Sequence, residues 1–142
     1  MGQSVKRSYL VIATIALLFL FTGCAQKISF QGSSVVSAAR GTVKIKKDNN
    51  KNYTIDISLY NLAEVQRLDP PRQTYVVWMV IDEGQTKNIG QIKSGEKMLS
   101  KKLKASLNTV SSFKPVKIFI TAEDDAAIQF PGNQVILSTS NF

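Results

Sequence analysis

Much of the chain consists of strand-length segments in which apolar and polar residues alternate, separated by clusters of turn-forming residues. Residues 42–46 alternate in this way, and the alternation returns over residues 53–59, after an asparagine- and aspartate-rich stretch at residues 48–52. Alternation with a period of two places every second side chain on the same face of a strand. Asparagine and aspartate favour tight turns. The two segments therefore predict a β-hairpin with one buried face.

Four further segments have the composition of strands. Residues 74–81 are largely β-branched or aromatic and apolar on both faces, which predicts a central strand. After a turn over residues 82–87, residues 88–92 are expected to return as its partner. Residues 116–122 and 134–138 follow stretches that contain proline, and they complete the set of expected strands.

Two segments are ambiguous. Residues 98–107 carry leucines four positions apart, as a helix would, but their lysines also allow a short polar strand, which we expect. Residues 61–68 allow a helical turn that Pro70 and Pro71 would end, so a crossover loop is expected. Short strands at close intervals, without a convincing long helix, predict an all-β antiparallel β-sandwich of about seven or eight strands, immunoglobulin-like in general architecture.

The first 24 residues have a different character. Lys6 and Arg7 precede an apolar run over residues 9–21, and Cys24, the only cysteine, follows it closely. A helix that spans a bilayer needs about 20 apolar residues, whereas the core of a signal peptide needs about 7 to 15. Residues 1–23 are therefore predicted to be a helical signal peptide that is removed on export.

Gly23 and Cys24, with Thr22 before them, resemble the lipobox of bacterial lipoproteins. The resemblance implies signal cleavage between Gly23 and Cys24 and attachment of fatty acid, palmitate included, at Cys24. Phe21 departs from the pattern, which most often has leucine at that position. An uncleaved signal anchor over residues 9–25 is the alternative, and the shortness of the apolar run argues against it.

The lipoprotein resemblance also implies a location and a domain plan. The protein would be lipid-anchored on the extracytoplasmic side of the cell membrane. Ala25 and Gln26, rather than an aspartate, directly follow Cys24, which favours the outer membrane in a host that has one. Residues 24–32 would be the lipidated cysteine and a tether, and residues 33–142 a single domain. With its one thiol bound to lipid, this domain has no disulfide and depends on core packing.

The exported part is moderately basic. Residues 1–23 hold two of the 18 basic residues and none of the 10 acidic ones, which leaves a net charge of +6. The lysines fall mainly in residues 44–51 and 93–104. They could attract anionic lipid headgroups or another polyanion, but the preferred interpretation is that they are solvated and keep sheet edges apart. Export and the lack of interleaved aromatic residues argue against nucleic acid as a partner.

Residues 75–80, 89–92, 118–123 and 131–133 share their order and spacing with a known domain. They make residues 42–140 similar to the C-terminal extracytoplasmic domain of anti-sigma-K-type factors. The resemblance implies a β-sandwich and, by fold analogy, a role in envelope sensing or protein binding. Members of that family carry a sigma-binding domain and a transmembrane helix ahead of this module. Residues 1–8 are too short to supply a sigma-binding domain, so the chain is not expected to inhibit a sigma factor by itself.

Residue types suited to catalysis are scarce. The chain has no histidine, and Cys24 is assigned to lipid, so the commonest general base and a thiol nucleophile are both missing. Residues 123–125 are acidic, but they lack the alternating spacing and the glycine of a calcium loop and are interpreted as a solvated turn. We expect no enzyme activity, cofactor or metal site, and a carboxylate-based hydrolase is the least favoured hypothesis.

Tyr75, Trp78 and Phe119 are the candidate binding residues. They could line a pocket for an apolar ligand, but such residues more often fill a sandwich core, which is the preferred interpretation. The leading hypothesis is a lipid-anchored, non-enzymatic module that senses or binds another envelope protein. The alternative is a lipid-anchored carrier of a small apolar ligand held between the sheets.

Overall fold

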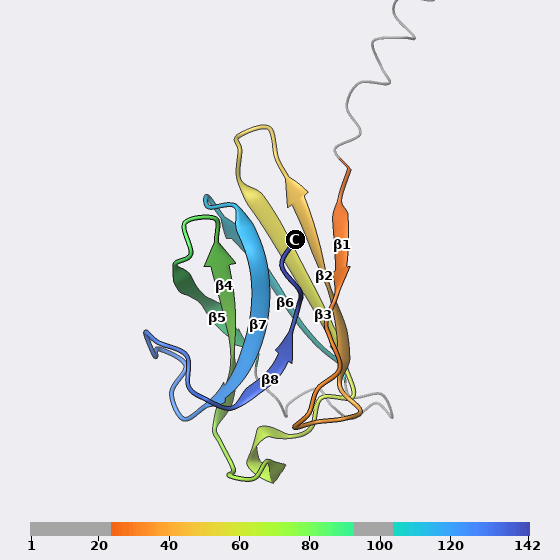
Figure 1. Ribbon diagram of the computed structural model, residues 1–142, viewed down its shortest axis with the longest axis vertical. Coiled ribbons are helices and arrows are strands. Elements are labelled where there is room, and N and C mark those ends of the chain that lie inside the picture. The colour runs from red at the N-terminus through yellow and green to blue at the C-terminus, as the bar shows by residue number, and fades with distance from the viewer. Residues whose placement is uncertain (1–23, 93–103) are drawn as a thin grey trace, which may run out of the picture.

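The computed structural model describes residues 24–92 and 104–142, which form two four-stranded antiparallel sheets packed face to face (Figure 1). The first sheet consists, in order across it, of β1 (Gln26–Ser29), β2 (Arg40–Lys47), β3 (Tyr53–Tyr60) and β6 (Lys104–Ser111). The second consists of β5 (Thr86–Ile92), β4 (Thr74–Ile81), β7 (Pro115–Glu123) and β8 (Val135–Ser138). The predicted antiparallel β-sandwich is confirmed, with eight strands among the described residues.

β2 and β3 form the predicted hairpin. Val43 pairs with Ile57, and both side chains are buried, because the period-two pattern turns the same alternate positions of both strands to the core. Asp48 closes the turn: its Oδ1 accepts hydrogen bonds of 2.8 Å from the backbone N–H groups of Asn50 and Asn52. An aspartate that binds the backbone just after it in this way fixes a tight turn.

The segment expected to be a tether contains β1. Gln26–Ser29 pairs antiparallel with β2. Ile28 packs against the core, and Phe30, just beyond the strand, is buried. Because these two apolar side chains alternate with polar ones and face the core, the structure places residues 26–30 within the sandwich rather than in a flexible spacer.

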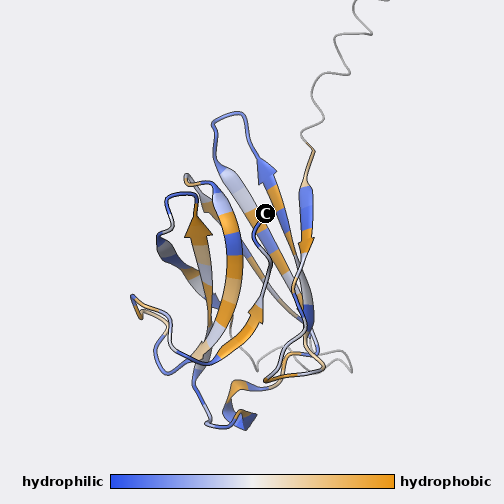
Figure 2. Cartoon of the chain, viewed as in Figure 1, coloured by the Kyte–Doolittle hydropathy of each residue, from blue (hydrophilic) through white to orange (hydrophobic). Residues whose placement is uncertain are grey.

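The core between the sheets is mainly aliphatic. β4 contributes its odd-numbered residues and β7 its even-numbered ones, namely Tyr75, Val77, Met79, Ile81, Ile118, Ile120 and Ala122. The opposite face of β4 is also buried at Val76 and Trp78. Burial on both faces explains why this strand is hydrophobic along most of its length (Figure 2).

Several strand boundaries differ from the sequence prediction, and two of them have a clear structural reason. β5 begins at Thr86 rather than at residue 88, because Gly84, with a φ of 78°, makes a tight turn in which the Ile81 N–H donates to the Gln85 carbonyl over 3.0 Å. β6 runs to Ser111, four residues beyond the expected segment, because it pairs along the whole of β3. Residues 98–103 of that expected segment lie outside the described residues.

The strand pairing brings three turns together at one end of the sandwich. Tyr53 at the start of β3 pairs with Ser111 at the end of β6, and Ile81 at the end of β4 pairs with Pro115 at the start of β7. Cys24 lies at the same end, just before β1 (Figure 1). We call this the Cys24 end; its turns are residues 48–52, 82–85 and 112–114.

The opposite end carries the longer connections. Residues 30–39 follow β1 there, and residues 124–134 leave β7 and enter β8 there (Figure 1). Residues 61–73 cross from the first sheet to the second, as the sequence predicts, with a short 3-10 turn at Val65–Arg67. Within the described residues, no helix has the length and apolar character needed to cross a membrane.

Candidate functional site

Cys24 is the first residue that the structure describes, and its thiol is free and exposed. A single residue, Ala25, separates it from the start of β1 at Gln26. Gly23, the residue on the other side of the expected cleavage point, lies outside the described residues. Cys24 is therefore accessible to modification and directly adjoins the folded domain.

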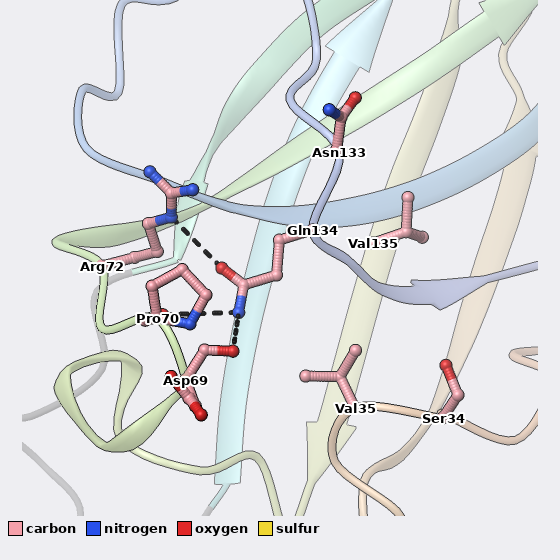
Figure 3. Close-up of a pocket in the computed structure, with 8 residues that line it drawn as sticks. All are labelled: Ser34, Val35, Asp69, Pro70, Arg72, Asn133, Gln134 and Val135. Atoms are coloured by element: carbon pink, nitrogen blue, oxygen red, sulfur yellow. Dashed lines mark hydrogen bonds between the residues drawn. The ribbon is translucent and has the colours of Figure 1, made fainter.

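A pocket of about 470 Å³ opens at the opposite end of the sandwich (Figure 3). Three separate segments contribute to it: one that follows β1, one that precedes β4 and one that enters β8. Its lining residues are Ser34, Val35, Asp69, Pro70, Arg72, Asn133, Gln134 and Val135. The pocket thus depends on connections that the two sheets bring together from distant parts of the chain.

Arg72 and Gln134 hold one side of the pocket together. The Arg72 Nε donates to Gln134 Oε1 over 3.2 Å, and its Nη1 makes a 2.5 Å ion pair with Asp124. Gln134 Nε2 in turn lies 3.4 Å from the backbone carbonyl oxygens of Asp69 and Pro70. This polar network ties the segment before β4 to the segment before β8 and gives the pocket a fixed polar wall (Figure 3).

The other side of the pocket is formed by two valines and Ser34 (Figure 3). Val35 and Val135 lie across from Arg72 (Figure 3) and are 43% and 41% exposed, respectively. Pro70 adds a third apolar surface, on the same side as Arg72 (Figure 3). An open site with one apolar wall and one hydrogen-bonding wall suits an amphipathic segment, because each wall offers a different kind of contact.

The three aromatic residues singled out in the sequence do not line one site. Tyr75 lies in the core between the sheets, where its hydroxyl donates to the Ala63 carbonyl over 2.9 Å and burial raises its pKa to about 12. Trp78 and Phe119 pair on the opposite face of the second sheet, with ring centroids 6.3 Å apart. Trp78 is fully buried, as a core residue should be, but it lies on the outer face of the second sheet rather than between the sheets, because residues three apart on a strand face opposite sides.

A chain of hydrogen bonds runs from Trp78 to the loop at residues 124–134. Trp78 Nε1 donates to Thr121 Oγ1 over 2.8 Å, and Thr121 Oγ1 donates to Glu123 Oε1 over 2.5 Å. The same carboxylate oxygen accepts the backbone N–H of Gly132 over 2.7 Å. Three buried polar side chains thus satisfy one another beneath the loop, as buried polar groups must.

The loop is held at a second point and presents an exposed aromatic side chain. Asn88 Nδ2 donates to the carbonyl oxygens of Ala126 and Ile128, over 2.9 and 3.0 Å. Phe130, two residues further along, is 80% exposed, the highest value among the large exposed hydrophobic residues described. The loop therefore displays a large apolar ring from a backbone that is fixed on both sides of it.

The acidic residues 123–125 are not a single solvated turn as predicted. Glu123 is only 5% exposed because its carboxylate accepts hydrogen bonds beneath the loop. Asp124 pairs with Arg72, and Asp125 Oδ1 accepts the Ala127 N–H over 2.9 Å. The three carboxylates thus have separate partners, and the described residues contain no group of three metal-ligating side chains.

Arg72, Gln134 and Phe130 are the site residues that the sequence does not single out. Arg72 and Gln134 are 62 positions apart, so their contact depends on the pairing of β4 and β8 with β7 in the second sheet. Phe130 has a local signal, because it stands directly before the Pro131-Gly132 turn, where an apolar side chain has little chance of burial. A comparison of the chain with protein-family models, curated proteins and solved structures finds no match.

Proposed function

We propose that this chain is a lipoprotein held in the membrane through Cys24 and that it acts as a non-enzymatic, protein-binding module of the cell envelope. The observation that carries the proposal is the position of Cys24 and the pocket at opposite ends of the sandwich. An anchor at one end leaves the pocket and its loops open to a partner at the other.

The anchor is supported by sequence and placement together. The short apolar run and Gly23 before Cys24 resemble a lipoprotein signal. The exposed thiol lies outside the sandwich, so acylation there disturbs no packing. Absence of an aspartate after Cys24 favours the outer membrane in a two-membrane host.

Protein binding is supported by the chemistry of the surface at the far end. Val35 and Val135 border the pocket, Arg72 supplies donors, and Phe130 is displayed on the adjoining loop. Aromatic and arginine side chains with an apolar surround are typical of the residues that dominate protein interfaces. The surface therefore fits a partner segment with apolar and hydrogen-bonding side chains.

The strand order of the second sheet supports a relationship to immunoglobulin-like sandwiches. The order β5-β4-β7-β8 corresponds to the C′-C-F-G order of an immunoglobulin-like sheet, and β4, like strand C, carries a tryptophan. In the first sheet β2-β3-β6 corresponds to the A-B-E order, and the sheet differs in that β1 is added beside β2 and β6 is an edge strand among the described residues. We propose a related sandwich that shares with anti-sigma-K-type extracytoplasmic domains a role in envelope sensing, without sigma-factor binding of its own.

The anchor is tested by intact mass and fractionation of the full-length chain expressed in a bacterium that processes lipoproteins. The wild type should lose residues 1–23, gain acyl mass and fractionate with membranes. Cys24→Ser should keep the precursor mass and incorporate no labelled fatty acid. If the two proteins have the same processing and both lack acyl mass, the anchor is excluded.

Partner binding is tested by photo-crosslinking in cells from positions 130 and 135, with position 110 as control. Val110 is 61% exposed but lies on β6, away from the pocket. Positions 130 and 135 should give the same protein adduct, position 110 should not, and Val135→Asp should remove the adduct formed from position 130. Equal adducts from all three positions contradict the proposal, and a co-purifying apolar ligand without a protein adduct favours the carrier hypothesis instead.

A further inference from the structure

Lysines gather on the β1–β2–β3 side of the Cys24 end. Lys27, Lys44, Lys46, Lys47 and Lys51 are all exposed there. Lys27 and Lys44 are paired residues of β1 and β2, and the other three belong to the end of β2 and its turn. The one acidic residue of that turn, Asp48, accepts hydrogen bonds from the turn backbone. Asp56 on β3, the strand partner of Lys44, is a second acidic residue beside them. This group, the hairpin lysines, therefore places five positive charges against the two negative charges of Asp48 and Asp56.

The other turns of the Cys24 end do not offset this charge. Lys87 and Lys114 balance Asp82 and Glu83 there. At the opposite end the described residues include five acidic side chains, Glu64, Asp69, Glu123, Asp124 and Asp125, against four basic ones. Among the described residues, the end beside Cys24 is therefore basic and the end beside the pocket slightly acidic. Residues 93–103, which lie outside the described residues, add four lysines and one glutamate.

The hairpin turn reaches the same level as Cys24. Gln26 pairs with Ile45, and β2 continues for two residues beyond Ile45 to Lys47. Cys24 stands two residues before Gln26, so at about 3.3 Å per residue it lies near the level of Lys47. Residues 48–52 extend further still (Figure 1) and form the hydrophilic tip of the hairpin (Figure 2).

An aromatic residue adds to this surface. Phe113, in the turn between β6 and β7, is 46% exposed, and the ammonium of Lys87 lies 4.5 Å from its ring centroid. Its turn adjoins the hairpin because Ser111 pairs with Tyr53. An exposed aromatic ring beside lysines is the combination that settles at the headgroup level of a bilayer.

We infer that the Cys24 end is a membrane-docking surface on which the hairpin lysines bind anionic phospholipid headgroups. The inference rests on the proposed anchor, which would hold the hairpin turn against the bilayer through a single intervening residue. Each basic side chain close to an anionic surface strengthens attachment about fivefold. Docking by this end turns the pocket away from the membrane, so the lysines set the orientation in which a partner meets the domain.

The inference is tested with the acylated full-length protein reconstituted into vesicles. A photo-crosslinking residue replaces Asn50 at the hairpin tip in one protein and Gln66 at the opposite end in another. In vesicles of phosphatidylcholine with about a third phosphatidylglycerol, position 50 should form lipid adducts and position 66 should not. Lys46→Glu with Lys51→Glu should lower the adduct yield about tenfold or more, as should vesicles of phosphatidylcholine alone.

A matched charge control separates location from total charge. Arg67→Glu with Lys104→Glu makes the same change in net charge, at the end away from Cys24, and should leave the adduct yield at position 50 unchanged. Flotation of the vesicles reports the anchor independently: protein that fails to float contradicts the proposed anchor. Protein that floats but forms equal adducts at positions 50 and 66, or is insensitive to the hairpin substitutions, overturns the docking surface alone.

Discussion

Trp78 and Thr121 are joined by a 2.8 Å hydrogen bond on the face of the second sheet that points away from the core. The two residues lie on neighbouring strands, β4 and β7, and both are fully buried. The threonine hydroxyl also donates to Glu123, so it is the link between the indole and the loop at residues 124–134. This hydroxyl therefore couples the buried indole to the carboxylate that holds the loop at Gly132.

Thr121→Val should destabilise the protein. Valine keeps the shape of the side chain but leaves the Trp78 N–H without an acceptor and removes a donor from Glu123. A buried polar group without a partner costs about 1 to 3 kcal/mol, so the free energy of unfolding should fall by about 2 to 4 kcal/mol. Urea denaturation measures it. Thr121→Ser, which keeps the hydroxyl, should lose less than half as much, and equal losses for both variants would show that the hydroxyl is unimportant.

Gly132→Ala should disturb the same network from the loop. An added Cβ would lie 2.7 Å from Glu123 Oε2 and 3.0 Å from Oε1, so the buried carboxylate would have to move. We expect a loss of about 1 to 3 kcal/mol and, because Trp78 is the only tryptophan, a red shift of its emission in the folded state. Gly32→Ala is the control, since its Cβ would meet nothing within 4 Å. An unchanged emission maximum in Gly132→Ala would argue against coupling between the loop and Trp78.

The strands were predictable because their signals are local. The alternation around Val43, the alternation around Ile57 and the turn at Asp48 each depend on residues only a few positions apart in the sequence. The apolar character of β4 predicted burial on both faces, but not what covers the second face. On that side the loop at residues 124–134 is attached by side chains of β5 and β7, which are distant from it in the sequence or depend on the fold to reach it.

The pocket could not be predicted either, because it too depends on contacts between residues that are distant in the sequence. Its walls join Val35, Arg72 and Gln134, which belong to three connections, and no periodic pattern or motif links them.

The strand β1, in contrast, does carry a local signal, because Ile28 and Phe30 alternate with polar residues. The segment is short and lies next to Cys24, so its composition fits a tether as well as a strand. Pairing with β2 decides between them.

Asn88→Ala should loosen the loop without unfolding the sandwich. The substitution removes the two donors to Ala126 and Ile128, each worth about 1 kcal/mol. Local opening should therefore rise about 5- to 30-fold, which limited proteolysis followed by mass spectrometry would detect as faster cleavage within residues 124–134. Asn108→Ala, at an exposed position that contacts Asp56, should leave the cleavage rate unchanged. Faster cleavage throughout the chain would indicate global destabilisation instead.

The buried hydroxyl of Tyr75 should make the protein less stable as the pH rises above 10. Burial raises the pKa of its hydroxyl from 10.0 to about 12, so between these values the unfolded chain loses a proton that the folded chain keeps. The contribution is fully present below pH 10 and is lost as the pH rises to 12, and by pH 11 the loss should reach about 1 to 1.5 kcal/mol.

Tyr75→Phe provides the comparison, because lysines and the other tyrosines titrate in both proteins. At pH 8 the variant should be less stable by about 1 kcal/mol, since the Ala63 carbonyl loses its donor. On going to pH 11, the wild type should lose more stability than the variant, so the difference between them should close or reverse. Urea denaturation at both pH values measures this, and parallel losses in the two proteins would mean that the hydroxyl titrates alike in the folded and unfolded chains.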